Sequence, residues 1–303
     1  MSALSPTPTP AHQLQAEPAH TAPTTESHNI VPLVAPAGDV KATINYYNPP
    51  EDGSTPYNFV YDPPAGVPQR NFTRASHEVL IRDVRGHEGE VALDEQSFLP
   101  ISGVSTSMTT ADWSDEGAVQ RKYYPEVEAL LLKLCPGAHR VQIFDHTHRV
   151  SQEGAKRGPV LTAHIDQTPE AALARVAQHL PAEDVPALQA GRVRLINIWR
   201  PLRPVVTFPL AVGDSRTFKE DNLVAVEHRY PTKTGYTAQI RYDPEAQWWY
   251  WSGMDPVRGE VLALQCFDSE TGGRAPHTAF VDPRSEGWEA ERESVEVRAL
   301  VFG

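Results

Sequence analysis

One imidazole and one carboxylate stand two residues apart in the segment AHIDQTP, at His164 and Asp166. Val160 and Leu161 precede them, and an extended backbone would point both polar side chains to one face and Ile165 to the other. Such a pair can fill two neighbouring positions of an octahedral metal. A His-x-Asp tripeptide alone is a weak signal, because a surface pair or a hydrogen-bonded core histidine has the same pattern.

A third ligand is expected from a later strand, and His277 begins the short apolar run HTAFV. Two histidines and one carboxylate form the facial triad of non-haem Fe(II) oxygenases, which leaves coordination positions open for oxygen chemistry. His228 in EHRYP is the competing ligand. The segment after it, RYPTKTG, has the composition of a turn rather than of a strand that enters a core. We therefore expect His164, Asp166 and His277 to bind the metal and to be the catalytic residues.

Arg292 and Ser294, in RESVEVRALVF, would share one face of a strand. A guanidinium pairs with a carboxylate in bidentate fashion and a hydroxyl adds one donor, which suits the distal carboxylate of a dicarboxylate cosubstrate, 2-oxoglutarate. The alternative is an exposed strand edge with ion-pairing neighbours. The order His-x-Asp, then His, then Arg-x-Ser matches the layout of a 2-oxoglutarate-dependent barrel, and this joint match is stronger than its parts.

A β-rich framework is expected to position these residues. Beyond Ala190 the chain becomes a succession of short strand-like runs separated by turn signals, which predicts a double-sheet antiparallel barrel with helices packed outside: a mainly β, α+β fold of the jelly-roll type. The runs are VRLINIW, VVTFPLAV, NLVAVE, YTAQIRY, QWWYWS, EVLALQCF, HTAFV and SVEVRALVF. In the Trp248–Trp251 run, the rings are as consistent with core packing as with a pocket wall.

The chain before Ala190 is predicted to contain two helices. One covers RKYYPEVEALLLKL and ends at Pro136; the other begins at a Thr168 cap with Pro169 at its first position and closes at Pro181. The segments HEVLIRDVRG and AHRVQIFDHT read as strands. Residues 1–38, rich in Pro and Thr, are expected to be a disordered tail, and residues 39–303 a single domain. Within it, residues 41–68 are expected to wrap over the surface without regular structure.

Composition excludes several classes of function. The formal net charge is −12, so a nucleic-acid or anionic-membrane partner has little support, and a small-molecule substrate is expected. Only two cysteines are present, no run reaches the ~18 apolar residues of a membrane helix, and the N-terminus lacks a signal-peptide pattern. These features predict a cytoplasmic protein. Neither the substrate nor the oligomeric state can be derived from them.

The amino-acid sequences of many segments resemble those of one family. DVRGHEGEVALDEQSF, YYPEVEALL, PGAHRVQIFDHTHR, AHIDQTP, INIWRPL, HRYPTKTG, CFDS and PHTAFVDP followed by RESVEVR occur in order from about Asp83 to Phe302. They are similar to the fungal Fe(II)/2-oxoglutarate-dependent oxygenases that include gibberellin desaturase and cephamycin-methoxylase-related proteins. One departure is Gln265, where the family pattern has a lysine before the CFDS-like segment. This departure predicts a change in the detail of the pocket.

The resemblance implies a double-stranded β-helix fold that requires Fe(II), 2-oxoglutarate and O2. It implies hydroxylation, desaturation or oxidative ring closure of a small molecule in specialised metabolism, with iron on His164, Asp166 and His277 and the cosubstrate carboxylate on Arg292 and Ser294. Two other functions stay open. The first is an iron oxidase of the isopenicillin type, in which the substrate supplies the electrons. The second is a catalytically inert barrel that binds a metabolite or a partner chain.

Overall fold

The computed structural model describes residues 33–152, 154, 155 and 157–303. Most of the predicted tail, residues 1–38, therefore lies outside the described residues. The described helices and strands all belong to one contact unit, Val34–Gly303. Within the described residues, no helix has both the length and the apolar character needed to cross a membrane.

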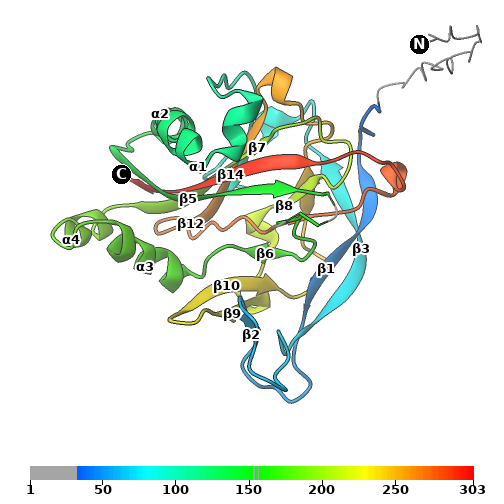
Figure 1. The fold of residues 1–303 in the computed structure, drawn as a ribbon, viewed down its shortest axis with the longest axis horizontal. Helices are drawn as coiled ribbons and strands as arrows, with labels where there is room; N and C mark the ends of the chain where they lie inside the picture. The colour runs from blue at the N-terminus through cyan, green and yellow to red at the C-terminus, as the bar shows by residue number, and fades with distance from the viewer. Residues whose placement is uncertain (1–32, 153, 156) are drawn as a thin grey trace, which may run out of the picture. The chain divides into compact units, whose positions relative to one another are not determined.

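Two β-sheets form the framework, as the succession of short strands predicted (Figure 1). The larger sheet has the order β1 (Val40–Asn48), β3 (Thr73–Asp83), β11 (Trp248–Tyr250), β8 (Leu210–Gly213), β13 (His277–Ala279), β6 (His164–Ile165), β10 (Thr234–Ile240), β9 (Leu223–Arg229) and β2 (Tyr57–Phe59). The smaller sheet has the order β4 (Phe98–Ile101), β12 (Val261–Asp268), β7 (Val193–Pro201), β14 (Glu293–Phe302) and β5 (Arg140–Val150).

Alternating side chains explain how the smaller sheet is buried on both faces. On β7, Leu195 and Trp199 enter the main core, which takes residues from both sheets, while Ile196 and Ile198 enter a second core. That second core lies under α2 (Tyr124–Leu134). Successive side chains of a strand point to opposite faces, so every other residue of β7 faces the space between the sheets. Polar residues in that inward set are the ones available to a site.

The predicted helices form outside the sheets (Figure 1). A short α1 (Glu116–Ala118) and a π-helical turn over Val119–Tyr123 lead into α2, which ends before Pro136 as expected. The helix α3 (Pro169–His179) begins at Thr168, whose side chain accepts a hydrogen bond of 3.2 Å from the backbone N–H of Ala171. A further short helix, α4 (Val185–Gln189), follows it.

The expectation that residues 41–68 lack regular structure is wrong. β1 pairs with β3 in antiparallel register along its whole length, from Val40 opposite Ile81 to Asn48 opposite Thr73. Its buried residues include Val40, Ala42, Ile44 and Tyr46, which alternate along the strand. That alternation is the sign of a strand with one buried face, and the high proline and asparagine content of the rest of the stretch obscured it.

The predicted strand over VVTFPLAV is shorter than expected, because only Leu210–Gly213 is extended and paired. Phe208 has a positive φ of 47°, which turns the chain, and Pro209 has no N–H to donate to a ladder. The turn delivers β8 between β11 and β13. β13 in turn lies beside β6, the strand that carries His164.

Candidate active site

The pairing of β6 with β13 brings together residues that are far apart in sequence. His277 lies directly opposite His164 in the antiparallel register, and Asp166 follows β6. One ligand atom from each of the three residues lies within 4.8 Å of the others. The Nε2 atom of His164 is 3.5 Å from Oδ1 of Asp166, and the Nε2 atom of His277 is 3.7 Å from the same oxygen.

Backbone carbonyls fix how the two imidazoles are presented. The Nδ1 atom of His164 lies 2.8 Å from the carbonyl oxygen of Thr162, and Nδ1 of His277 lies 3.1 Å from that of Ala275. A carbonyl oxygen only accepts, so each Nδ1 carries a proton, and in the neutral imidazole the lone pair is then on Nε2. Both lone pairs then face Asp166, which is how histidines are prepared for a metal.

The carboxylate of Asp166 is held by its other oxygen. Oδ2 accepts a 2.7 Å hydrogen bond from Nδ2 of Asn197 on β7 and lies 3.5 Å from Nη1 of Arg298 on β14. Burial opposes ionisation, but the contact with His164 and the charge of Arg298 more than offset it, so the pKa of Asp166 lies well below its usual value. Asp166 is therefore an anion with Oδ1 directed at the two histidines.

His277 is the most enclosed of the three. Burial, followed by the neighbouring His164, lowers the pKa of His277 to about 4. The imidazole is therefore neutral near pH 7, which is the form that binds a metal.

The three residues fit a divalent transition metal. Metal–ligand bonds of about 2.1 Å at right angles put neighbouring ligand atoms about 3 Å apart, a few tenths of an ångström closer than the contacts to Oδ1 of Asp166. The donor set is two neutral imidazoles and one carboxylate, the set of the non-haem Fe(II) facial triad. The three ligand atoms, which lie within 4.8 Å of one another, must move closer together to bind an ion.

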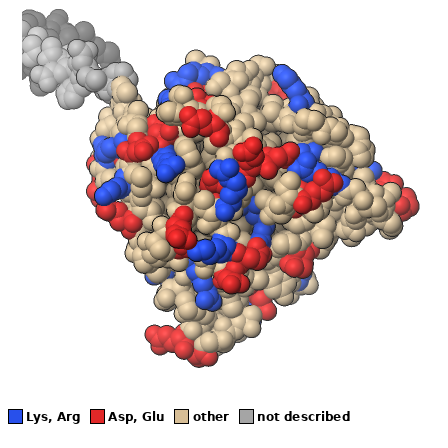
Figure 2. Space-filling view, turned by 180° about the vertical axis from the view of Figure 1, so that it is seen from behind, with Lys and Arg blue, Asp and Glu red and all other residues tan. Residues whose placement is uncertain are grey.

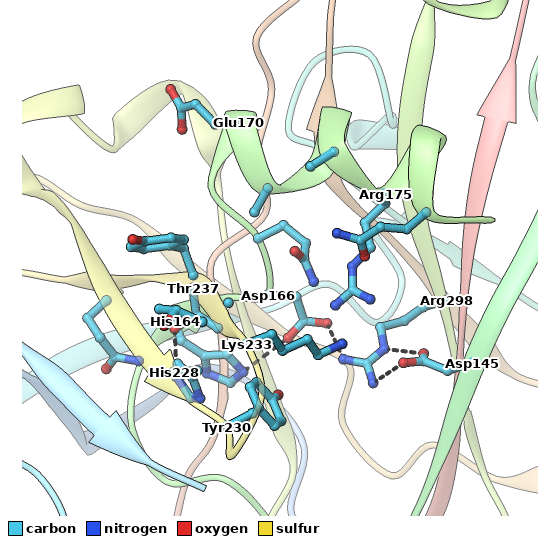
Figure 3. Close-up of a pocket in the computed structure, with 18 of the residues that line it drawn as sticks. Asp145, His164, Asp166, Glu170, Arg175, His228, Tyr230, Lys233, Thr237 and Arg298 are labelled. Atoms are coloured by element: carbon cyan, nitrogen blue, oxygen red, sulfur yellow. Dashed lines mark hydrogen bonds and ion pairs between the residues drawn. The ribbon is translucent and has the colours of Figure 1, made fainter. Parts of the chain in front are cut away.

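Two cavities meet at these residues. The outer one has a volume of about 570 Å³ and lies between α3, the β9–β10 hairpin and the strands β5 and β14 (Figure 3). The inner one has only about 20 Å³ and is lined by His277, Trp199, Arg292 and Glu296, among others. Their shared walls are Arg149, Val160, His164 and Asp166.

Arg292 is the unusual group of the inner cavity. It is 2% exposed, its guanidinium carbon lies 5.0 Å from the ring centre of Trp199, and its Nε atom has no hydrogen-bond partner within the described residues. Burial, together with the nearby charge of Arg149, lowers the pKa of Arg292 to about 10. A buried guanidinium with no carboxylate within 4 Å among the described residues is costly, so the site suits a ligand that brings a carboxylate.

Comparison with known proteins identifies the family. The family model described as an oxidoreductase/YMDC permease-like domain matches residues 44–302. The hydroxylase/desaturase poxK of Penicillium oxalicum is 35% identical over 316 residues, covering 92% of this chain and 97% of that protein. The Fe(II)/2-oxoglutarate-dependent dioxygenase nvfI of Aspergillus novofumigatus is 34% identical, covering 80% and 88%.

A solved structure agrees with these relatives. The iron and alpha-ketoglutarate-dependent endoperoxidase NvfI superposes with a TM-score of 0.77 at 29% identity, covering 88% of this chain and 98% of that one. The chain belongs to the fungal Fe(II)/2-oxoglutarate-dependent oxygenase family.

This oxygenase is an oxidoreductase with a jelly-roll fold, and its cofactors are Fe(II), 2-oxoglutarate and O2. The expected fold class, enzyme class and cofactors are confirmed. A small molecule as substrate agrees with the relatives. They also support a 2-oxoglutarate-dependent oxygenase over an isopenicillin-type oxidase or an inert barrel. The narrower likeness to gibberellin desaturase and cephamycin-methoxylase-related proteins stays a prediction.

The competing ligand, His228, lies outside the three-residue cluster. It is on β9 and lines the outer cavity, where its Nε2 atom is 3.1 Å from the hydroxyl of Thr237. The other predicted cosubstrate residue, Ser294, is buried on β14. Unlike Arg292, Ser294 is not among the residues that line either cavity.

Several residues of the site were left out of the predicted set. Asn197 and Trp199 face the site of the oxygenase from β7, whereas Arg200 points the other way and donates a 3.0 Å hydrogen bond to the hydroxyl of Tyr123. The available signal was an asparagine in the inward-facing set of an apolar strand. Arg149 and Arg298 carried no comparable signal in the sequence.

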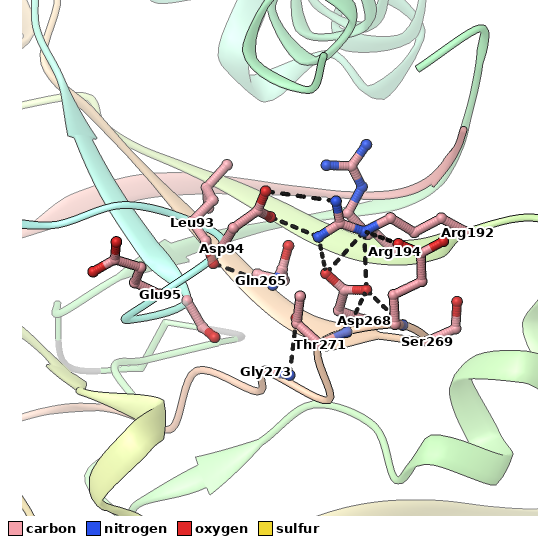
Figure 4. Close-up of polar contacts among 12 residues, drawn as sticks. Leu93, Asp94, Glu95, Arg192, Arg194, Gln265, Asp268, Ser269, Thr271 and Gly273 are labelled. Atoms are coloured by element: carbon pink, nitrogen blue, oxygen red, sulfur yellow. Dashed lines mark hydrogen bonds and ion pairs between the residues drawn. The ribbon is translucent and has the colours of Figure 1, made fainter. Parts of the chain in front are cut away.

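Gln265, the departure from the family pattern, lines neither cavity. It is fully buried on β12 and donates a 3.2 Å hydrogen bond from Nε2 to the carbonyl of Leu93 (Figure 4). Its Oε1 atom has no partner within the described residues. In the Trp248–Trp251 run, Trp248, Tyr250 and Trp251 lie in the main core and none of the four rings lines a cavity.

Proposed function

We propose that His164, Asp166 and His277 hold the Fe(II) of this oxygenase, and that Arg292 holds the distal carboxylate of 2-oxoglutarate. Ser294, two residues further along and on the same face, would add a hydroxyl donor once the inner cavity widens to admit the cosubstrate. Bound there, the iron and its cosubstrate supply the oxidation of an unactivated C–H bond by O2. The observation that most supports this proposal is the buried guanidinium of Arg292, whose Nε has no partner within the described residues. Arg292 lines the same cavity as His277 and Asp166.

The side chains of the oxygenase orient and protect this chemistry. Thr162 and Ala275 hold the protons of the two histidines on Nδ1, while Asn197 and Arg298 hold one oxygen of Asp166. The inner cavity has room for about one water molecule, so 2-oxoglutarate binding requires Arg149, which borders both cavities, to shift. Trp199 keeps the guanidinium of Arg292 in place by stacking under it.

We also infer that the oxygenase works on a free small molecule in the cytoplasm, without nucleic acid or membrane. Acidic and basic side chains are interspersed on the face in Figure 2, with no broad basic region, and the net charge is −12. Cys135 and Cys266 are both buried free thiols, as suits a reducing compartment.

The test is spectroscopic. Fe(II) and then 2-oxoglutarate are added to the purified protein without oxygen, and the visible metal-to-ligand charge-transfer band is recorded. We expect a band in the parent chain, none in His277→Ala, and in Arg292→Ala a band that needs about tenfold or more 2-oxoglutarate, because a buried charge-assisted pair is lost. Lys133→Gln, an exposed charge outside both cavities, is the control.

Two results would contradict the proposal. Bound iron without a band would indicate an oxidase that takes electrons from its substrate. A folded protein that binds no iron would indicate an inert barrel.

A further inference from the structure

The outer cavity of the oxygenase contains more positive charge than its own carboxylates balance. Asp145 and Asp166 are both engaged by Arg298, whose Nε lies 2.6 Å from Oδ1 of Asp145 and whose Nη1 lies 3.5 Å from Oδ2 of Asp166. The third acidic residue of the lining, Glu170, is solvent-exposed, as is Lys233, and the lining has four cations for three carboxylates. The remaining cations of the lining are Arg149, Arg175 and Lys233.

Two of these cations are oriented by aromatic rings rather than by carboxylates. The guanidinium carbon of Arg175, on α3, lies 5.2 Å from the ring centre of Phe144. The Nζ atom of Lys233, in the β9–β10 turn, lies 5.4 Å from the ring centre of Tyr230. Within the described residues, neither is in an ion pair of 4 Å or less. An aromatic face orients a cation without neutralising it.

Arg175 and Lys233 line the same cavity from opposite walls. Figure 3 shows Arg175 extending from α3 and Lys233 extending from the β9–β10 hairpin. The two cations therefore border one space from two sides.

We infer that the substrate of this oxygenase is an organic carboxylate, whose carboxylate group is bound by Arg175 and Lys233 while its body extends toward His164 and Asp166. The inference rests on the proposed function and names its substrate class. A guanidinium fork matches a carboxylate and a lysine adds one more donor. A volume of about 570 Å³ is in the range of small-molecule sites.

The proposed site of the substrate carboxylate is also separate from the site of the cosubstrate. Arg292 belongs to the inner cavity, Arg149 borders both, and Arg175 and Lys233 border only the outer one. The distal carboxylate of 2-oxoglutarate therefore has its own partner, and the two outer cations are left for the substrate. Because the chain has a net negative charge, these cations reduce the net charge that favours solubility. A role in binding therefore explains Arg175 and Lys233 better than a role in solubility.

A matched pair of probes tests the inference. The protein is loaded with Fe(II) and saturating 2-oxoglutarate without oxygen, and binding of 4-biphenylcarboxylate and of 4-biphenylcarboxamide is measured by equilibrium dialysis. The probes have nearly the same size and differ in charge. We expect the parent chain to bind the acid about tenfold or more tightly than the amide, because a partly desolvated charge pair is made only by the acid.

Variants assign the preference to the two cations. In Arg175→Gln/Lys233→Gln, the acid and the amide should bind alike. In Arg175→Lys/Lys233→Arg, which keeps both charges, the preference should persist in part. The matched control Lys41→Gln/Lys133→Gln removes two positive charges from exposed positions outside both cavities and should keep the full preference. Circular dichroism checks that each variant is folded.

Three results would overturn the inference: no preference for the acid in the parent chain, including no binding of either probe; a preference that survives in the double glutamine variant; or displacement of 2-oxoglutarate by the acid. The charge-transfer band, recorded in the same samples, distinguishes a failure of the proposed function from a failure of the substrate class. Without a band the proposed function fails. With a band and no preference, only the substrate class fails.

Discussion

At the scale of single residues, the site depends on groups that do not themselves face the iron. Asn197 is the clearest example, because it is fully buried and its amide donates to Oδ2 of Asp166 at 2.7 Å. That contact leaves Oδ1 facing His164 and His277. A hydrogen bond to the second oxygen of a carboxylate ligand fixes its direction, and such partners contribute substantially to metal affinity.

Asn197→Ala should therefore weaken Fe(II) binding about 10- to 100-fold, because Asp166 loses a fixed orientation. The measurement is an anaerobic Fe(II) titration followed by the charge-transfer band at saturating 2-oxoglutarate. Asn222→Ala is the matched control, since Asn222 donates to Asp243 at 2.9 Å and lines neither cavity. Unchanged iron affinity in a folded Asn197→Ala protein would restrict Asn197 to a packing role.

At the scale of elements, one ion-pair network joins the ends of strands in the smaller sheet (Figure 4). Asp268, the last residue of β12, accepts hydrogen bonds from the guanidinium of Arg192, just before β7, and from the backbone N–H of Glu270. Arg192 also contacts Asp94, 2.6 Å away, in the segment before β4. The side chain of Asp268 is fully buried, so its charge depends on these partners.

Asp268→Asn should lower the free energy of unfolding by about 2–4 kcal/mol at pH 7, because it removes the negative charge of a buried ion pair and leaves Arg192 without that partner. Burial acts against ionisation, but Arg192 and the N–H of Glu270 outweigh it, so the pKa of Asp268 is lowered. A lowered native pKa means that the stabilisation is present above the unfolded value of 3.8 and disappears as the pH falls through the native pKa.

Urea unfolding of the parent and variant at pH 7, 5 and 3 checks this prediction. The difference between them should be constant from pH 7 to 5 and smaller at pH 3. Asp184→Asn, in the more exposed pair with Arg140, should have a smaller effect at every pH. A difference that does not narrow in acid would mean that packing, and not charge, accounts for the loss.

At the scale of the whole molecule, the segment before β1 is tied to the folded unit. The carbonyl of Gly38 accepts a 2.7 Å hydrogen bond from the hydroxyl of Tyr250, and its N–H donates to Asp83 at 2.8 Å. The guanidinium of Arg284 donates to the carbonyl of Ala37 at 2.9 Å. These contacts fasten the edge strand β1 beside β3 and β11.

A chain that begins at Leu33 should match the full chain in melting temperature and in the charge-transfer band, because every contact described here is kept. A chain that begins at Asp39 loses the Ala37 and Gly38 contacts and should be less stable by about 1–3 kcal/mol. Thermal unfolding of the three proteins measures the effect. Equal stability of the two shortened chains would place the boundary of the domain at residue 38, as the composition predicted.

The sequence by itself determined the chemistry of this oxygenase and most of its elements, because those signals are local. The residue types in His-x-Asp, the later histidine and Arg292 indicate metal and carboxylate binding. Turn signals separate the short strand-like runs after Ala190, and Thr168 with Pro169 begins a helix. The high proline and asparagine content of residues 41–68 concealed β1, although the alternating pattern of its buried residues was also present in the sequence.

Only the tertiary structure decided which side chains meet. It placed His277 opposite His164, left His228 outside the cluster, and turned Asn197 and Arg298 toward Asp166. It also formed the outer cavity with its unbalanced cations. The physical reason is that these contacts arise from the pairing and register of strands distant in sequence, and a shift of one residue in register would turn each side chain to the opposite face.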